Sequence, residues 1–405
     1  MSKWKHKMNR DLEKLQPYPF EKLKALLGQV TPPRELKPIA LSIGEPKHPS
    51  PKIVLDSLVS NLSKLSIYPT TKGIPELRQA IAVWLKKRFK LKQTELNGDL
   101  HILPVNGTRE AIFSFTQVII DRSKNPLVIS PNPFYQIYEG ATFLAGAELH
   151  LLATLEENNF IPDYDSVPNE VWKRCQILFL CSPGNPTGAV TPLNTLKKLI
   201  ELSDKYNFVI ASDECYSEIY CDESKPPVGL LQACAELGRN DFKRCVVFHS
   251  LSKRSNLPGM RSGFVAGDAD ILSEFLKYRT YHGSAMPIQH QLASLVAWQD
   301  ESHVVENRNA YRQKFSSVLK ILKPVLNISQ TDASFYLWPE TPISDELFTQ
   351  QLFAQQNVTV LPGSYVSRTV NHLNPGENRI RIALVAPEAE CIEAAERIKS
   401  FVLSL

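Results

Sequence analysis

Residues 249–263 read His249-Ser250-Leu251-Ser252-Lys253-Arg254-Ser255-Asn256-Leu257-Pro258-Gly259-Met260-Arg261-Ser262-Gly263. They follow the apolar run 245–248, and this order predicts a buried strand that leads into a polar loop. Lys253 lies among serines just beyond the strand, eight residues before Arg261. A lysine amine in a desolvated pocket loses its charge readily and can attack a carbonyl to form a Schiff base. A solvated surface lysine is the alternative, and this stretch alone does not separate the two.

The composition is that of a large and nearly neutral globular chain. Its 405 residues are 43% hydrophobic, enough for a large core divided between two lobes. The net charge of +4, from 46 basic and 42 acidic residues, predicts no nucleic-acid binding. The seven cysteines lack C-x-x-C spacing, so we expect buried free thiols and neither disulfides nor a metal site. No stretch approaches the ~20 apolar residues of a membrane span, so we expect a soluble, untargeted cytoplasmic protein without membrane contacts.

From about residue 100 the chain alternates strand, turn and helix. The strand-like segments are continuous apolar runs rather than alternating ones, which indicates a mostly parallel sheet covered by helices on both faces. In such sheets ligands bind beyond the carboxyl ends of the strands. We therefore expect the polar loops after these runs to converge on one site. The runs span residues 101–105, 127–129, 177–180, 208–210 and 246–248.

The two ends of the chain differ from this central part. Five prolines between residues 17 and 38 leave room for only a short helix over 20–27, so we interpret residues 1–48 as an arm. Helical periodicity over 51–64 and 75–88 opens a large domain, residues 49–290. Residues 291–405 combine helices with strand-like stretches and predict a smaller α+β domain, which the arm joins.

Two of the loops suit an anion such as phosphate. Gly107 and Thr108 precede a predicted helix over 109–120, whose first turn presents free N–H groups and the positive end of the helix dipole. An ordinary helix cap is the alternative. Ser250 and Arg261, on either side of Lys253, add donors of the kind that phosphate prefers.

Other loops present polar groups that need partners. Asp213 directly follows a buried strand, a costly position for a carboxylate unless it meets a cation or caps a helix. Asn185 is held between a glycine and a proline, although such turns are common. Tyr135 can stack on a planar ring or fill the core, and Tyr216, three residues after Asp213, faces the same choice.

These loops resemble, in order and spacing, those of class I pyridoxal-phosphate-dependent aminotransferases of fold type I. The matching set is Ser-Pro-x-Asn-Pro-Thr-Gly at 182–188, Asp-x-x-Tyr at 213–216, and Ser-x-x-Lys at 250–253 with Arg261 beyond it. The resemblance runs from Gly44 to Arg381. It implies that Lys253 bonds pyridoxal 5′-phosphate and moves the substrate proton, and that Asp213 pairs with the pyridine nitrogen.

The same resemblance assigns the remaining site residues. It implies that Asn185 and Tyr216 bind the phenolic oxygen and that Tyr135 stacks on the ring. It implies a homodimer, in which Tyr68 of the second subunit completes the phosphate cup. Arg381 matches the arginine that holds the substrate α-carboxylate, with Gly44 at the entrance. Arg379 competes for that role, because the strand period of two puts both arginines on one face. The phosphate cup would consist of Gly107, Thr108, Arg109, Ser250 and Arg261.

Five segments narrow the resemblance to the bacterial N-succinyldiaminopimelate aminotransferase family: residues 18–23, 42–48, 68–73, 104–110 and 250–256. The implied reaction is ping-pong. L-glutamate gives its amino group to the cofactor, and N-succinyl-2-amino-6-oxopimelate accepts it, in lysine and diaminopimelate biosynthesis. The segment Asp332-Ala333-Ser334-Phe335 includes small residues where many relatives have a glycine, which leaves the pocket shape near the substrate open.

Other functions share many of these residues. An aminotransferase for another amino acid, or a cofactor-dependent lyase or synthase, would use the same cofactor contacts. A non-catalytic sensor that binds the cofactor is disfavoured, because no helix-turn-helix pattern precedes residue 40. A nucleotide site at Gly107 and Thr108 fails for want of a G-x-x-x-x-G-K-[ST] or G-x-G-x-x-G loop.

Overall fold

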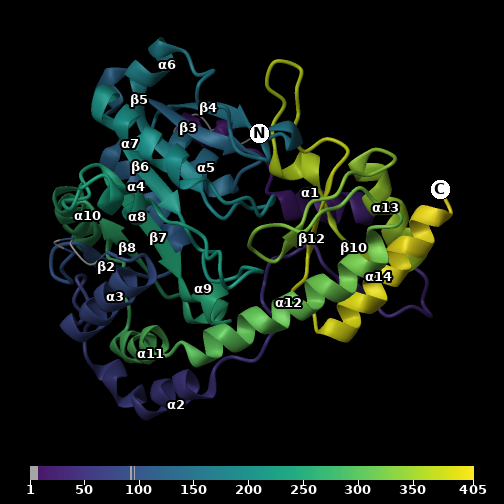
Figure 1. Ribbon diagram of the computed structural model, residues 1–405, viewed down its shortest axis with the longest axis horizontal. Coiled ribbons are helices and arrows are strands. Elements are labelled where there is room, and N and C mark those ends of the chain that lie inside the picture. The colour runs from purple at the N-terminus through teal and green to yellow at the C-terminus, as the bar shows by residue number, and fades with distance from the viewer. Residues whose placement is uncertain (1–7, 92–93, 95) are drawn as a thin grey trace.

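The computed structural model describes residues 8–91, 94 and 96–405. Figure 1 shows a larger body around a central sheet and a smaller body that holds the C-terminus, joined by the long helix α12. The division into an arm, a large domain and a small domain at residues 48/49 and 290/291 remains a prediction. None of the helices in the described part of the chain combines the length and the apolar character needed to cross a membrane.

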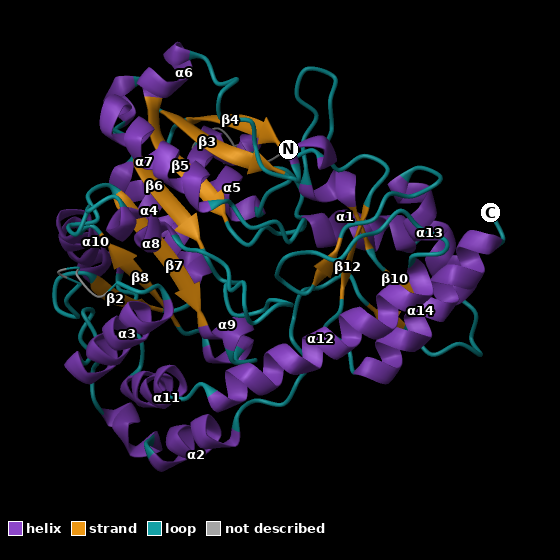
Figure 2. Ribbon diagram, in the orientation of Figure 1, coloured by secondary structure: helices purple, strands orange, loops and turns teal. Residues whose placement is uncertain are grey.

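A seven-stranded sheet with the order β2-β8-β7-β6-β5-β3-β4 organises the larger body (Figure 2). Strands β4, β3, β5, β6 and β7 pair in parallel, whereas β8 runs antiparallel between β7 and β2. The predicted α/β class with a mostly parallel sheet is therefore confirmed. The strands are β2 (Ile102–Val105), β3 (Leu127–Asn132), β4 (Glu148–Ala153), β5 (Cys175–Cys181), β6 (Val209–Asp213), β7 (Cys245–Ser250) and β8 (Gly263–Gly267).

Both faces of this sheet are buried, which explains the continuous apolar runs. In β7, Val246 and Phe248 pack into one hydrophobic cluster, while Val247 points to the opposite face and packs into another. A strand buried on both faces needs apolar residues at every position. The surrounding helices are α2 (Lys52–Ser60), α3 (Pro75–Arg88), α4 (Thr108–Ile119), α5 (Gln136–Leu144), α6 (Asn169–Arg174), α7 (Leu193–Tyr206), α8 (Leu230–Glu236), α9 (Leu251–Arg254), α10 (Ala269–His282) and α11 (Ile288–Gln299).

The smaller body combines helices with short strands, in agreement with the α+β prediction. Its antiparallel sheet has the order β11-β12-β9. From the N-terminal segment, β1 (Ile39–Ala40) pairs in parallel with β10, so this segment is part of the smaller body's structure. The other elements are α1 (Pro19–Leu27), α12 (Ser302–Leu322), β9 (Tyr336–Leu337), α13 (Asp345–Gln356), β10 (Val358–Thr359), β11 (Leu361–Pro362), β12 (Ile380–Ala383) and α14 (Glu388–Leu403).

Short 3-10 helices complete the fold, and one of them lies where the sequence predicted the end of an α-helix. The helix expected over 51–64 ends at Ser60, and the chain then tightens into η3. The 3-10 helices are η2 (Arg10–Lys14), η3 (Leu62–Ser66), η4 (Arg122–Lys124), η5 (Glu156–Asn158), η6 (Pro258–Met260) and η7 (Gly363–Val366). All seven cysteines are free thiols, and four of them are buried as expected, whereas Cys181, Cys215 and Cys221 are only partly buried.

Candidate active site

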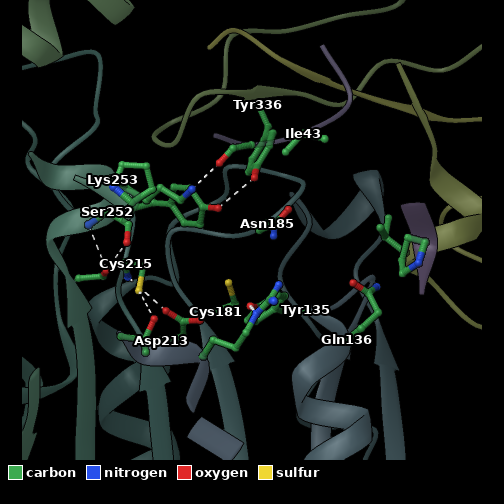
Figure 3. A pocket seen from close by; sticks show the side chains of 18 of the residues that line it. Ile43, Tyr135, Gln136, Cys181, Asn185, Asp213, Cys215, Ser252, Lys253 and Tyr336 are labelled. Carbon is green, nitrogen blue, oxygen red and sulfur yellow. Dashed lines mark hydrogen bonds between the residues drawn. The ribbon is translucent and has the colours of Figure 1, made fainter. Parts of the chain in front are cut away.

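A cavity with a volume of about 450 Å^3 lies at the carboxyl ends of the parallel strands, where the two bodies meet (Figure 3). The ends of β5, β6 and β7 form its floor, the smaller body contributes residues near β9 and β12, and the N-terminal segment closes one side. The polar loops predicted to converge therefore do so. The lining includes Tyr18, Ile43, Gly44, Thr108, Arg109, Tyr135, Cys181, Asn185, Asp213, Cys215, Tyr216, Ser250, Ser252, Lys253, Arg261, Tyr336 and Arg381.

Lys253 lies in this cavity on α9, the short helix that follows β7. Ser250 caps that helix, since its Oγ accepts a hydrogen bond from the Ser252 amide at 3.1 Å. The Lys253 Nζ donates to the carbonyl of Gly44 and lies 5.3 Å from the centre of the Phe335 ring. Burial lowers the pKa of Lys253 to about 8. A neutral amine is the nucleophile, so this environment suits attack on a carbonyl.

Asp213 lies at the end of β6 and is only 7% exposed. Its carboxylate accepts hydrogen bonds from the Tyr138 hydroxyl at 2.8 Å and the Cys215 amide at 3.3 Å. Burial raises the pKa of Asp213, and these donors act in the opposite direction. A buried carboxylate on a cavity floor is well placed to pair with a protonated ring nitrogen.

Gly107 and Arg261 form the cradle predicted for phosphate. Gly107 is the N-cap of α4 and has φ 86°, a left-handed conformation that favours glycine. A Cβ at this position would collide with the guanidinium of Arg261. The helix N-terminus and the guanidinium therefore face one another closely and could hold an anion between them. Thr108, Ser250 and Ser252 line the same side of the cavity.

The side chain of Arg109 has other partners than the cradle. Its Nε donates to the Tyr135 hydroxyl at 2.7 Å, and its terminal nitrogen donates to the Tyr18 hydroxyl at 2.8 Å. Tyr135 also packs edge-on against Tyr138, with ring centroids 5.8 Å apart. The backbone of Arg109 belongs to the first turn of α4, while its exposed side chain adds a positive charge to the cavity.

The structure separates the two competing arginines. Arg381 lines the cavity, donating to Asn185 at 3.0 Å and to the carbonyl of Ser42 at 2.7 Å. Its Nε is buried without a hydrogen-bond partner among the described residues. Arg379 instead pairs with Glu156 at 2.6 Å and with Glu340 at 2.9 Å. Arg381 therefore has a donor to offer a carboxylate, and Arg379 is engaged elsewhere.

The remaining predicted residues differ in their placement. Tyr216 is buried beside the cavity, and its hydroxyl lies 3.0 Å from that of Tyr336. A Cβ on Gly44 would collide with the Tyr336 hydroxyl, so this close approach needs glycine. Tyr68 lies outside the cavity of its own chain and is 99% exposed.

Sequence reasoning missed several residues of the site. Tyr138 holds Asp213, and Tyr336 closes the cavity above Asn185, as Figure 3 shows for Tyr336. Tyr138 lies three residues after Tyr135, but this helical spacing does not reveal its contact with Asp213, which is 75 residues away in the sequence. Tyr336 belongs to a predicted strand, but its hydroxyl meets the site only through packing between the two bodies. Other cavity residues that the sequence did not indicate are Tyr18, Ile43, Cys181, Cys215 and Ser252.

These residues fit a phosphorylated pyridine aldehyde. The glycine-and-arginine cradle suits its phosphate, Asp213 its ring nitrogen, and Lys253 its carbonyl carbon. When bound, pyridoxal 5′-phosphate supplies a ring that withdraws electrons from the substrate Cα. With that group in place, Asp213 would keep a proton on the ring nitrogen, Arg381 would orient the amino acid through its carboxylate, and Lys253 would move the proton at Cα.

A mostly parallel sheet with a lysine, an aspartate and an anion cradle at its strand ends defines the class of pyridoxal-phosphate-dependent enzymes to which aminotransferases belong. The chain belongs to the family Aminotransferase class I and II, whose model matches residues 37–398. It is therefore a pyridoxal-phosphate-dependent aminotransferase.

Several known proteins are similar along nearly the whole chain. The LL-diaminopimelate aminotransferase of Dehalococcoides mccartyi is 30% identical over 403 residues, covering 98% of this chain and 99% of the relative. That of Aquifex aeolicus is 33% identical over 371 residues, 90% of this chain and 92% of the relative. An aminotransferase structure from Neisseria meningitidis has a TM-score of 0.93 and 50% identity, covering 97% and 100%. The aminotransferase AspB of Helicobacter pylori has a TM-score of 0.89 and 35% identity, covering 96% and 100%.

Proposed function

We propose that this aminotransferase transfers the amino group of L-glutamate to N-succinyl-2-amino-6-oxopimelate by a ping-pong mechanism, in lysine and diaminopimelate biosynthesis. Two findings support the pathway. Relatives at 30–33% identity are named LL-diaminopimelate aminotransferases, which act on the same seven-carbon skeleton. The motifs at residues 42–48 and 68–73 resemble the succinyl-specific family. The roles assigned to Lys253, Asp213, Tyr216 and the cofactor contacts form part of the same proposal.

The charges of the cavity favour an acylated substrate over free diaminopimelate. Among the described residues, Asp213 is the only carboxylate in the lining, and it lies at the floor beside Tyr138. Free diaminopimelate carries a distal ammonium, which would need an acidic partner. In the succinylated substrate that nitrogen is a neutral amide, and the distal charges are carboxylates.

The observation that carries the proposal is the position of the Arg109 side chain in the cavity. Four cations line the cavity in the described part of the chain, and in this proposal Lys253, Arg261 and Arg381 act at the reacting carbon, the phosphate and the α-carboxylate. Arg109 remains, held by Tyr18 and Tyr135. Its guanidinium is suited to a distal carboxylate, either of the succinyl group or of the glutamate side chain.

The reverse reaction tests this assignment. With 2-oxoglutarate as acceptor, N-succinyl-LL-diaminopimelate and LL-diaminopimelate are compared as donors, and we expect kcat/KM to be at least roughly tenfold higher for the succinylated compound. A higher kcat/KM for free LL-diaminopimelate would contradict the proposal and indicate an LL-diaminopimelate aminotransferase, the activity for which the relatives are named. Arg109→Gln should raise KM for the succinylated donor roughly 10- to 100-fold, while L-alanine, which lacks a distal carboxylate, should be affected much less.

We also propose a cytoplasmic homodimer with shared sites. Tyr68 is fully exposed and continues an exposed apolar surface on α2 and η3 that a second copy could cover. That surface comprises Ile53, Leu55, Val59, Leu62, Leu65 and Ile67. Mixed refolding of Tyr68→Phe and Lys253→Ala chains tests sharing, because a hybrid dimer regains one complete site. Recovery of roughly a quarter of the wild-type activity is expected, and no recovery would contradict the assignment of Tyr68.

A further inference from the structure

The segment that begins at Gly44 contacts the catalytic-lysine region at three points. The Gly44 carbonyl accepts the hydrogen bond of Lys253 Nζ. His48 bonds to Asn307 at 2.7 Å, and the Ser50 hydroxyl donates to the carbonyl of Asn256 at 3.2 Å. One end of the lysine is thus contacted directly, and the other end is reached through Asn307.

Asn307 caps the helix that carries the lysine. It lies on α12, is 5% exposed, and donates from Nδ2 to the carbonyls of Lys253 at 3.2 Å and Arg254 at 3.4 Å. These carbonyls belong to the end of α9, where a helix leaves its acceptors without intrahelical donors. α9 has only four residues and therefore few backbone hydrogen bonds of its own, and Asn307 adds side-chain donors at its end.

His48 determines which way the Asn307 amide faces. Because the amide oxygen can only accept, the 2.7 Å contact requires a proton on His48 Nδ1. With its oxygen turned to His48, the amide presents its NH2 group to α9. Burial lowers the pKa of His48, so the ring is neutral near pH 7. The ring also packs on Tyr311, one turn further along α12, at 4.6 Å between centroids.

We propose that Asn307, oriented by His48, is a positioning residue that fixes the main chain of Lys253 to α12. Because α12 runs from the larger to the smaller body (Figure 1), this contact fixes the position of Lys253 relative to the helix that joins the two bodies. This inference rests on the assignment of Lys253 in the proposed mechanism. A loss of the Asn307 contacts leaves the amine present but displaces it, and a displacement of about 1 Å can cost roughly 100-fold in rate.

The test compares Asn307→Leu, which keeps the size but removes the donor, with Asn309→Ala on an exposed position of the same helix. In the holoenzyme we expect Asn307→Leu to lower kcat roughly 10- to 100-fold, to change KM little, and to shift the pH midpoint of the cofactor absorbance band. In the apoprotein, hydrogen exchange at the amides of Ser255 and Leu257 should accelerate. Asn309→Ala should match wild type in all four measurements.

His48 provides a second test if Asn307→Leu does not fold. His48→Asn can place a donor near the position of Nδ1, whereas His48→Leu cannot. We expect the leucine variant to reproduce the loss of kcat and the faster exchange, and the asparagine variant to recover most of both. Equal effects of the two substitutions, or wild-type kcat, pH midpoint and exchange in Asn307→Leu, would overturn the proposal. If the wild-type protein has no aminotransferase activity but the variants still differ from it in hydrogen exchange as expected, only the proposed function is refuted.

Discussion

Tyr138→Phe probes how the protein controls the charge of Asp213. The substitution removes one hydroxyl, which donates to the Asp213 carboxylate at 2.8 Å in a fully buried setting. The ring itself should stay in place, because it stacks on Phe179 with centroids 4.7 Å apart and an interplanar angle of 14°. The variant therefore removes a hydrogen bond while preserving the packing.

The size of the effect follows from that hydrogen bond. A bond to a charged group contributes roughly 1.5–3 kcal/mol. Because the Tyr138 hydroxyl stabilises the ionised form, its loss should raise the pKa of Asp213 further. A weaker negative charge on Asp213 holds the ring proton less firmly. If the whole loss reaches the transition state, kcat falls roughly 10- to 100-fold.

Stopped-flow measurement of the half-reaction with L-glutamate gives the rate directly. Tyr164→Phe is the matched control, because it removes a buried tyrosine hydroxyl outside the cavity and should leave the rate unchanged. Asp213→Asn should lose more activity than Tyr138→Phe. The reasoning is refuted if Tyr138→Phe stays within twofold of wild type, or if Tyr164→Phe slows the reaction equally.

Three further substitutions test other contacts. Gly44→Ala should lower kcat and cost roughly 1–3 kcal/mol of stability, because the new methyl group displaces the Tyr336 hydroxyl; unfolding in denaturant and steady-state rates measure both. Arg381→Lys should raise KM for every amino acid roughly 10- to 100-fold, since a lysine lacks the two-donor fork; an unchanged KM would reject its carboxylate role. Lys314 is buried, and burial lowers its pKa to about 8. The unfolded chain therefore binds the Lys314 proton more tightly than the folded chain, and the resulting loss of folding stability is largest below pH 8. Lys314→Met should therefore be stabilised relative to wild type at pH 7, by at most roughly 3 kcal/mol, and this advantage should shrink as the pH rises from 8 to about 10.5 in chemical denaturation; an advantage independent of pH would contradict the linkage.

The main elements of the fold were predictable because their signals are local. A continuous apolar run marks a strand buried on both faces, and the runs at 177–180 and 246–248 became β5 and β7. Two strands of the seven-stranded sheet escaped prediction. β4 is partly exposed along most of its length, which dilutes its apolar signal, and β8 begins and ends with glycine. The antiparallel direction of β8 depends on pairing with β7 and β2, which no local pattern encodes.

The candidate site was only partly predictable. Lys253 and Asp213 attracted attention because a polar residue at or just beyond the end of a buried strand is conspicuous in the sequence, and the family resemblance then implied their roles. Tyr138 and Asn307 could not, since each acts on a partner that is distant in the sequence: Tyr138 is 75 residues from Asp213, and Asn307 is 54 residues from Lys253. A helical tyrosine or asparagine carries no local sign of the group that it will meet.

The amino-acid sequence by itself determined the alternation of strands and helices and the polar loops at the strand ends, where Lys253 and Asp213 lie, because periodicity and burial act over a few residues. Only the tertiary structure gives Arg381 and Arg379 different surroundings. The strand period treats them alike, but Arg379 pairs with Glu156 and Glu340 while Arg381 lies beside Asn185. The tertiary structure also decided the surroundings of Lys253. The Gly44 carbonyl and Phe335 lie next to the amine and Asn307 binds the main-chain carbonyl, and these three groups come from remote segments. Burial of the amine in this packed region lowers its pKa.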